Sequence, residues 1–142
     1  MKQIPTNLLR SALHIFLFWV GLTAKAQDSL TVKPYQTGKA TYYSAKMHGR
    51  RMANGQAYSK HGFTCAHRSL PFGTRLKVLN KQNGKTTIVE VSDRGPFRKG
   101  LVVDISNAAA AELDMLRAGV VPVEIYVLPD SMSNNLINKN EK

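Results

Sequence analysis

Cysteine is nearly absent from this sequence, which contains only Cys65. A single thiol cannot form a disulfide within the chain, so the fold must depend on its hydrophobic core. Cys65 lies in the segment Phe63-Thr64-Cys65-Ala66. A buried thiol behaves as a small hydrophobic side chain, and we predict that Cys65 belongs to the core. The alternative is a nucleophilic thiol served by His67, two residues further on.

Sequence motifs for metal and nucleotide binding are also absent. His48, His61 and His67 lack the HExxH spacing of a zinc site. Gly73 and Gly95 stand in turns or beside prolines, where they permit unusual backbone angles, and they do not form a phosphate-binding loop. We therefore predict no metal, no nucleotide and no other cofactor.

Acidic residues are missing from a long part of the chain. Residues 29–89 contain no Asp or Glu but 11 Lys and Arg, and the formal net charge of the whole chain is +11 at pH 7. Such a surface attracts polyanions at long range, although a role in solubility alone is the alternative. Carboxylate chemistry must therefore come from the second half, where the candidates are Glu90, Asp93, Asp104, Glu112, Asp114 and Glu124.

The apolar run near the N-terminus, Ala12–Leu22, is 11 residues long and is short of the roughly 20 needed to cross a bilayer. Lys2 and Arg10 precede it and small residues follow it, which predicts a secretory signal peptide over residues 1–26. We expect an exported protein of the periplasm, cell wall or extracellular space, without a permanent membrane anchor. Export argues against nucleic acid as a partner and favours wall carboxylates, wall polymers or lipid head groups.

Short apolar runs separated by turn residues indicate a mainly β domain over residues 38–128, between a linker (27–37) and a disordered tail (129–142). The Asn83-Gly84 pair favours a hairpin turn. One helix is expected over Asn107–Leu116, capped by Ser106 and ended by Gly119. The predicted strands are Lys39–Tyr43, Arg75–Leu79, Thr86–Ser92, Leu101–Ile105 and Val123–Leu128.

Asp93 and Asp104 differ from the other acids because each stands at the end of a predicted strand. Asp93 opens the turn Asp93-Arg94-Gly95-Pro96, and Asp104 follows Leu101-Val102-Val103. A carboxyl group sheltered by apolar neighbours has a raised pKa, which suits a general acid. The structural alternatives are a turn-forming side chain for Asp93 and a role at the start of the helix for Asp104.

The order of several segments resembles the rare lipoprotein A family and, more distantly, the expansin barrel. The resemblance covers essentially all of residues 38–128, and its strength lies in the joint order and spacing of the segments. They are Gly38-Lys39-Ala40-Thr41-Tyr42-Tyr43, Ala53-Asn54-Gly55-Gln56-Ala57-Tyr58, residues 64–74 (TCAHRSLPFGT), Val78-Leu79-Asn80, Asn83-Gly84, Val91-Ser92-Asp93-Arg94-Gly95-Pro96-Phe97, Val103-Asp104-Ile105-Ser106 and Ala109-Ala110.

This resemblance implies a six-stranded double-psi β-barrel with one short helix. It also implies a lytic transglycosylase that cuts peptidoglycan glycan strands between N-acetylmuramic acid and N-acetylglucosamine. By position, Asp93 would be the acid and base, Asp104 the second choice, and His67 would orient or polarise. The implied substrate-binding residues are Asn54, Gln56, Arg94 and three tyrosines that could stack on sugars, Tyr42, Tyr43 and Tyr58.

Gln56 departs from the family pattern, because active members usually carry glutamate there and an amide cannot exchange a proton. Ser59 likewise stands where many members carry aspartate. A glutamine still forms hydrogen bonds with hydroxyl or N-acetyl groups, so binding survives this change more readily than catalysis. The family's common C-terminal wall-binding repeat is not expected in the tail. The alternative function is therefore a non-catalytic, expansin-like glycan-binding module.

Overall fold

The computed structural model describes residues 32–130. The predicted signal peptide, residues 27–31 of the predicted linker and residues 131–142 of the predicted tail lie outside the described residues. Within 32–130, no helix has both the length and the apolar character that a membrane span requires.

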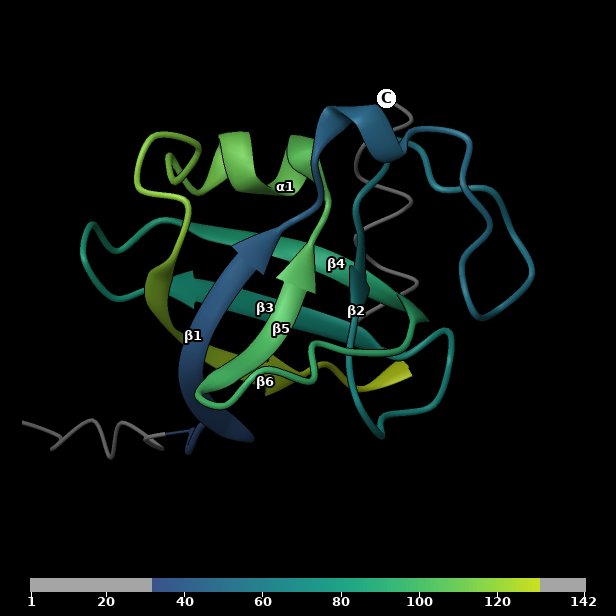
Figure 1. Ribbon diagram of the computed structural model, residues 1–142. Helices are drawn as coiled ribbons and strands as arrows, with labels where there is room; N and C mark the ends of the chain where they lie inside the picture. The colour runs from purple at the N-terminus through teal and green to yellow at the C-terminus, as the bar shows by residue number, and fades with distance from the viewer. Residues whose placement is uncertain (1–31, 131–142) are drawn as a thin grey trace, which may run out of the picture. The chain divides into compact units, whose positions relative to one another are not determined.

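Six strands close into a barrel in the order β1-β5-β2-β4-β3-β6 (Figure 1). The β1–β5 and β2–β4 pairs are parallel and the other four pairs are antiparallel. This is the mainly β, six-stranded barrel that the family resemblance implied. The strands are β1 (Gln36–Tyr42), β2 (Thr64–Ala66), β3 (Arg75–Asn80), β4 (Thr86–Asp93), β5 (Leu101–Ile105) and β6 (Val121–Val127), with a short 3₁₀ helix, η1, at Ala45–Met47.

The prediction of strands missed β2, which has only three residues. A run this short has no measurable hydrophobic periodicity, since alternation needs at least four residues to be recognised. Even so, β2 pairs with both β4 and β5 and completes the barrel wall. The turn predicted at Asn83-Gly84 joins β3 to β4, and Gly84 adopts the positive φ of 75° that such a turn requires.

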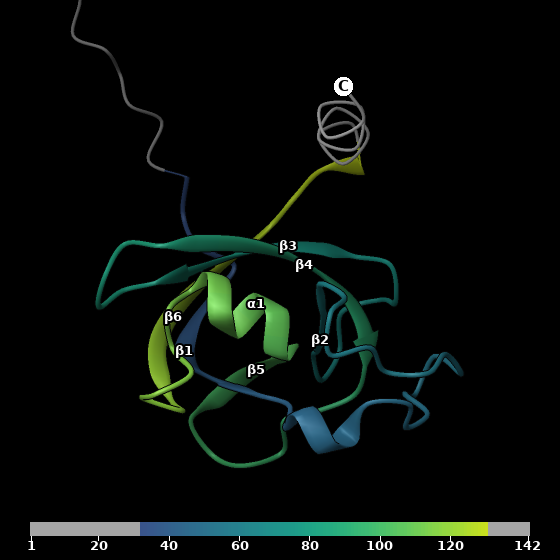
Figure 2. The same cartoon turned by 90° about the horizontal axis from the view of Figure 1, so that it is seen from above.

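Residues 32–130 contain one α-helix, α1 (Asn107–Glu112), which lies across one end of the barrel, where Figure 2 places it inside the ring of strands. Ser106 caps it as predicted, because its hydroxyl oxygen accepts a hydrogen bond from the Ala109 N–H. The predicted end at Leu116 with Gly119 is wrong. The helix stops earlier because Leu113 forms the C-cap and Asp114 takes a positive φ of 52°.

Two separate apolar clusters pack on the two faces of the barrel wall. The main cluster fills the interior with alternate strand residues and with Ala109, Ala110 and Leu113 from the helix end. Cys65 is fully buried in it, which confirms the core prediction, and burial raises the pKa of its thiol far above the ordinary value. The second, outer cluster contains Tyr43, Met52, Tyr58 and Ala66.

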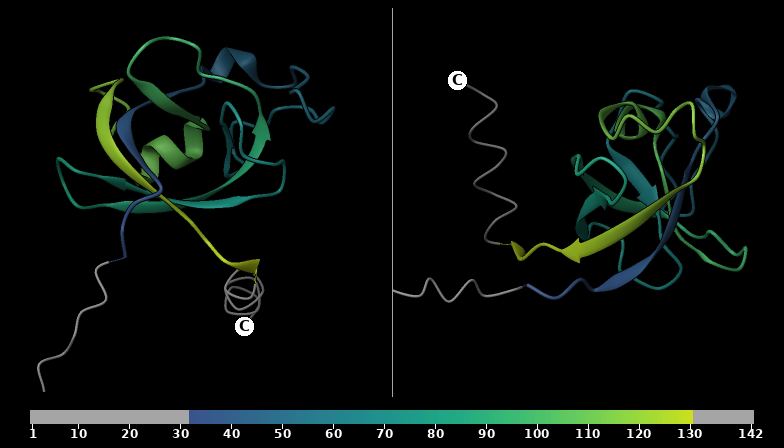
Figure 3. Two further views of the ribbon diagram at one scale, coloured as in Figure 1. Left: turned by 90° about the horizontal axis from the view of Figure 1, so that it is seen from below. Right: turned by 90° about the vertical axis from the view of Figure 1, so that its left-hand side faces the viewer.

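Strands β1 and β6 lie side by side and close the barrel (Figure 3). The segment between β1 and β2, residues 43–63, packs on the outer face through the second cluster. We call this segment the outer loop. It bears on function because it lies against the strand ends that carry the two aspartates.

Candidate active site

Asp93 and Asp104 flank Ala66 in the barrel wall. Ala66, at the end of β2, pairs with Asp93 of β4 on one side and with Asp104 of β5 on the other. Asp104 pairs in turn with Thr41 of β1. Residues paired across strands point to the same face of a sheet, so these four side chains form one row on the outer face. Two strand spacings separate the aspartate α-carbons, about 10 Å along the wall.

A register shift in β4 directs Asp93 toward this face. Cys65 pairs with Val91 but the next residue, Ala66, pairs with Asp93, so Ser92 is an extra residue in β4. Such bulges redirect side chains and occur often beside active sites. The Ser92 hydroxyl contacts the Met52 sulfur at 3.1 Å in the outer cluster, which holds the bulge against the outer loop.

Asp93 accepts three hydrogen bonds, two of them from the outer loop. The Tyr43 hydroxyl donates to one oxygen at 2.6 Å, and the backbone N–H groups of Ala53 and Arg94 donate to the other, each at 2.8 Å. An ionised carboxylate is an acceptor only, so this set of donors suits the charged form. Burial and the Asp93 carboxylate raise the pKa of Tyr43, which keeps its hydroxyl a donor.

Asp104 is in a different environment, because its side chain accepts a hydrogen bond only from the Thr41 hydroxyl, at 3.1 Å, among the described residues. Burial raises its pKa to about 6, the Thr41 hydrogen bond opposes this shift, and the nearby Asp93 charge adds to it. The two carboxyl groups therefore differ in kind. Asp93 is held as an acceptor, and Asp104 can carry a proton close to neutral pH.

A family model described as lytic transglycolase, a double-psi β-barrel domain, matches residues 35–125. The chain belongs to this family. The match begins one residue before β1 and ends within β6, so it spans the barrel almost from end to end.

Curated relatives in this family are longer than the chain. The probable endolytic peptidoglycan transglycosylase RlpA of Aquifex aeolicus is 49% identical over 88% of this chain and 56% of that protein. The endolytic peptidoglycan transglycosylase RlpA of Vibrio cholerae is 43% identical over 66% of this chain and 35% of that protein. The chain thus spans about half or less of the length of these relatives.

The double-psi fold is also found in a solved expansin. The apo structure of the expansin from Clavibacter michiganensis superimposes with a TM-score of 0.53 at 27% identity, covering 66% of this chain and 50% of that one. Both resemblances noted in the sequence, to rare lipoprotein A and to expansins, are therefore confirmed.

His67 does not join the aspartates through its ring. Its Nδ1 accepts hydrogen bonds from the backbone N–H groups of Ser69 and Leu70, so its Nε2 carries the proton and donates to Gln36 at 3.1 Å. The side chain is 3% exposed, and burial, with the charges of Arg94 and Arg68, lowers its pKa. Both ring nitrogens have protein partners, and neither partner is Asp93 or Asp104; a role of His67 at a reaction centre stays a prediction.

Two of the three tyrosines expected to stack on sugars, Tyr43 and Tyr58, are buried in the outer cluster. Tyr43 is 8% and Tyr58 2% exposed, and the two rings pack edge to face at 4.9 Å, so neither offers a free face. Tyr58 also accepts a hydrogen bond from the Asn107 N–H. Tyr42 is half-buried, and its hydroxyl donates to the carbonyl of Leu116. Only Tyr42 keeps part of its ring accessible.

Arg94 and Asn54 are held largely by the protein itself. The Arg94 guanidinium donates to the carbonyls of His67 and Leu70 and lies 3.9 Å above the Phe72 ring. The Asn54 side chain exchanges hydrogen bonds with Gln56, which is exposed in a turn of the outer loop. Because Ala53 in the same loop binds Asp93, Gln56 lies on the segment that contacts this aspartate, but its own hydrogen bonds are with Asn54 and not with either carboxyl group.

Sequence reasoning missed Thr41, the one side chain between residues 32 and 130 that donates a hydrogen bond to Asp104. It lies within the matched segment Ala40-Thr41-Tyr42, but only the β1–β5 register places it opposite the aspartate. Within residues 32–130, no group of three or more potential ligands could hold a metal ion.

Proposed function

We propose that this chain is an endolytic peptidoglycan lytic transglycosylase, exported to the cell wall. The observation that carries the proposal is the pair of unlike carboxyl groups on either side of Ala66, one of which has a pKa raised to about 6. A general acid works best with a pKa near the operating pH. The curated names of the Aquifex and Vibrio relatives support the same reaction.

The reaction needs one group that first gives and then takes a proton. Protonated Asp104 donates to the oxygen that bridges muramic acid and glucosamine, and the bond between muramic C1 and that oxygen breaks. The Asp104 carboxylate then accepts the proton of the muramic C6 hydroxyl, whose oxygen bonds to C1 and closes a 1,6-anhydro ring. No water is consumed, and Asp104 ends protonated again.

This assignment reverses the order of the two aspartates that the resemblance implied. Asp93 accepts three hydrogen bonds, whereas Asp104 accepts one among the described residues and has a pKa raised to about 6. The charged Asp93 favours the protonated form of Asp104 and faces the positive charge that develops at C1 during cleavage. Asp93 also fixes the outer loop through Tyr43 and Ala53.

A glycan-binding module without catalysis remains the second candidate, because one specific observation favours it. Gln56, at the position where the resemblance implies a glutamate in active members, is an exposed amide bound to Asn54 and cannot transfer a proton. If this position limits turnover, Gln56→Glu should release more anhydro product than the wild type. An unchanged rate would show that the amide is not the limitation.

The deciding experiment is mass spectrometry of purified glycan strands after incubation with the protein. We expect 1,6-anhydro-muramic ends with the wild type and none with Asp104→Asn, while Asp104→Asn still sediments with insoluble wall material. Glu112→Gln, at an exposed carboxyl group on α1, is the matched control and should retain activity. Intact strands with the wild type, together with binding to the wall, would favour the second candidate.

Export is tested separately from activity. Expression of the full chain should give a processed protein that begins at Gln27 and is recovered outside the inner membrane. An unprocessed protein in the cytoplasmic fraction would contradict this part of the proposal.

A further inference from the structure

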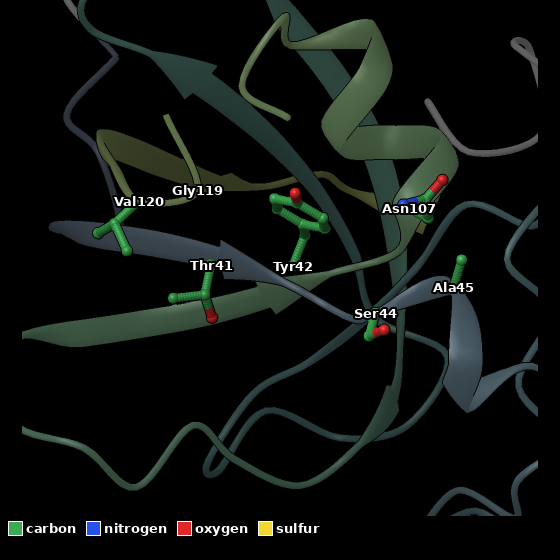
Figure 4. A pocket seen from close by; sticks show the side chains of 7 residues that line it. All are labelled: Thr41, Tyr42, Ser44, Ala45, Asn107, Gly119 and Val120. Carbon is green, nitrogen blue, oxygen red and sulfur yellow. The ribbon is translucent and has the colours of Figure 1, made fainter. Parts of the chain in front are cut away.

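An open pocket lies at the end of β1 and is lined in part by Thr41, the residue that donates a hydrogen bond to Asp104. It has a volume of about 490 Å³, within the range of small-ligand sites. Figure 4 shows side chains from three parts of the chain around it: Thr41 and Tyr42 from β1, Ser44 just after β1, Asn107 at the start of α1, and Gly119 and Val120 just before β6.

This pocket continues the row of side chains that contains the two aspartates. Thr41 lines the pocket and also donates its hydroxyl hydrogen to Asp104. The order along the outer face is therefore Asp93, Ala66, Asp104, Thr41 and then the pocket. When a glycan strand lies across this row with its reacting bond at Asp104, one of its sugar units lies in the pocket.

The polar groups of the pocket include an uncommitted side-chain amide. The Asn107 side chain has no hydrogen-bond partner among residues 32–130, whereas its backbone N–H donates to Tyr58 and fixes its position. An amide offers one acceptor and two donor hydrogens, so it complements the N–H and C=O of another amide. Ser44 adds a hydroxyl group beside it.

The apolar residues of the pocket suit the ring and the acetyl methyl group of an acetylated sugar. The hydroxyl of Tyr42 is bound to the Leu116 carbonyl, which fixes the orientation of the ring. Val120 is 45% exposed, an apolar surface that a methyl group could cover. Gly119 contributes no side chain, and a Cβ there would meet nothing within 4 Å, so this wall stays open.

We propose that the pocket is a subsite for one N-acetylhexosamine unit of the glycan strand. The Asn107 amide binds the acetamido group, Val120 covers its methyl, and Tyr42 lies against the sugar ring. The proposal rests on the function proposed above. It adds the unit that is recognised and the residues that select acetylated over unacetylated glycan.

The test uses binding alone, so it does not depend on cleavage. The probes are triacetylchitotriose and cellotriose, which share the β-1,4 linkage but differ in the acetamido group. Titration of the ¹⁵N-labelled protein by NMR should shift the signals of Asn107 and Val120 with triacetylchitotriose. We expect Asn107→Ala to weaken the binding of triacetylchitotriose about 5- to 10-fold, which is the effect of losing one or two hydrogen bonds. Cellotriose affinity should be unchanged by this substitution.

Gln82→Ala is the matched control, because Gln82 is an exposed amide in the β3–β4 turn that does not line the pocket. Ala45→Trp is a second variant, which should block the pocket and abolish the shifts at Asn107 without touching the core, since Ala45 is exposed. Equal affinity of the wild type and Asn107→Ala for triacetylchitotriose would overturn the proposal. Shifts confined to the separate pocket around Tyr35 and Ser69 would do the same.

The two proposals fail in different ways. Selective binding of triacetylchitotriose through Asn107, without anhydro product from glycan strands, keeps the subsite and removes the catalytic function. Anhydro product with no effect of Asn107→Ala on affinity or on KM keeps the function and removes the subsite.

Discussion

Replacing Asp104 by asparagine should stabilise the folded protein at neutral pH. The folded structure holds the proton of Asp104 more tightly than the unfolded chain does, since its pKa is raised from 3.8 to about 6. The stability that this proton contributes is fully present below pH 3.8 and is lost as the pH rises through about 6. Asparagine has the shape of the protonated acid and can accept the Thr41 hydrogen bond, so it avoids that loss.

The size of the effect follows from the shift. About two pKa units correspond to about 3 kcal/mol at most, because each unit is worth about 1.4 kcal/mol. The variant and the wild type should have similar free energies of unfolding at pH 3.5. As the pH rises to about 7, the free energy of unfolding of the variant should increasingly exceed that of the wild type, and the difference should then level off. Asp104→Asn removes a negative charge from a chain whose net charge is +11, and the added self-repulsion by itself should lower stability. The gain in stability expected here therefore has the opposite sign to the effect of net charge.

Urea unfolding of both proteins between pH 3.5 and 8 measures the difference directly. Glu112→Gln removes one exposed negative charge from the helix and controls for net charge. A constant difference across the pH range would refute the proposed burial of an ionisable Asp104. A gain of similar size in Glu112→Gln would assign the effect to charge in general.

Three further predictions concern the rest of the molecule. Tyr43→Phe removes a buried donor to Asp93 and should lower the free energy of unfolding by about 1.5–3 kcal/mol. Tyr126→Phe removes a more exposed hydroxyl group that donates to Glu124, and it should have a smaller effect in the same urea titration. Cys65 should not react with a thiol reagent in the native protein and should react fully in denaturant; rapid native reaction would contradict its burial. Retention of the protein on insoluble wall material should fall as the salt concentration rises. The double variant Arg50→Gln, Arg51→Gln should weaken retention at low salt, because both arginines are exposed on the outer loop. Retention that is insensitive to salt would exclude charge attraction.

The two aspartates could be predicted from the sequence because each stands at the end of a recognisable strand. Their relation to each other could not. It depends on β2, whose three residues carry no periodic signal, and on the extra residue Ser92, which no pattern indicates. Only the pairing of Ala66 with both strands brings Asp93 and Asp104 to one face.

The surroundings of the predicted tyrosines and of His67 could not be read from the sequence. The sequence identifies Tyr43, Tyr58 and His67 as polar aromatic residues near strand ends, which is equally true of ligand-binding and structural residues. Their roles depend on burial and on partners from distant segments. Tyr43 meets Asp93 from 50 residues away, and His67 meets Gln36 from 31 residues away. Local sequence contains no information about such contacts, so the structural alternative could not be separated from the functional one.

The buried carboxyl group of Asp104 on the outer face lowers the stability of the fold at neutral pH, and the barrel does not need it in order to close. Interior packing in the main cluster closes the barrel without Asp93, Asp104 or the outer loop. A hydrophobic residue at position 104 would avoid the burial of a carboxyl group whose ionised form is disfavoured. Perturbed carboxyl groups that stability does not need are concentrated at functional sites. The position of Asp104 near a like charge, with an open pocket next to its donor Thr41, is therefore better explained by chemistry on a bound molecule than by folding.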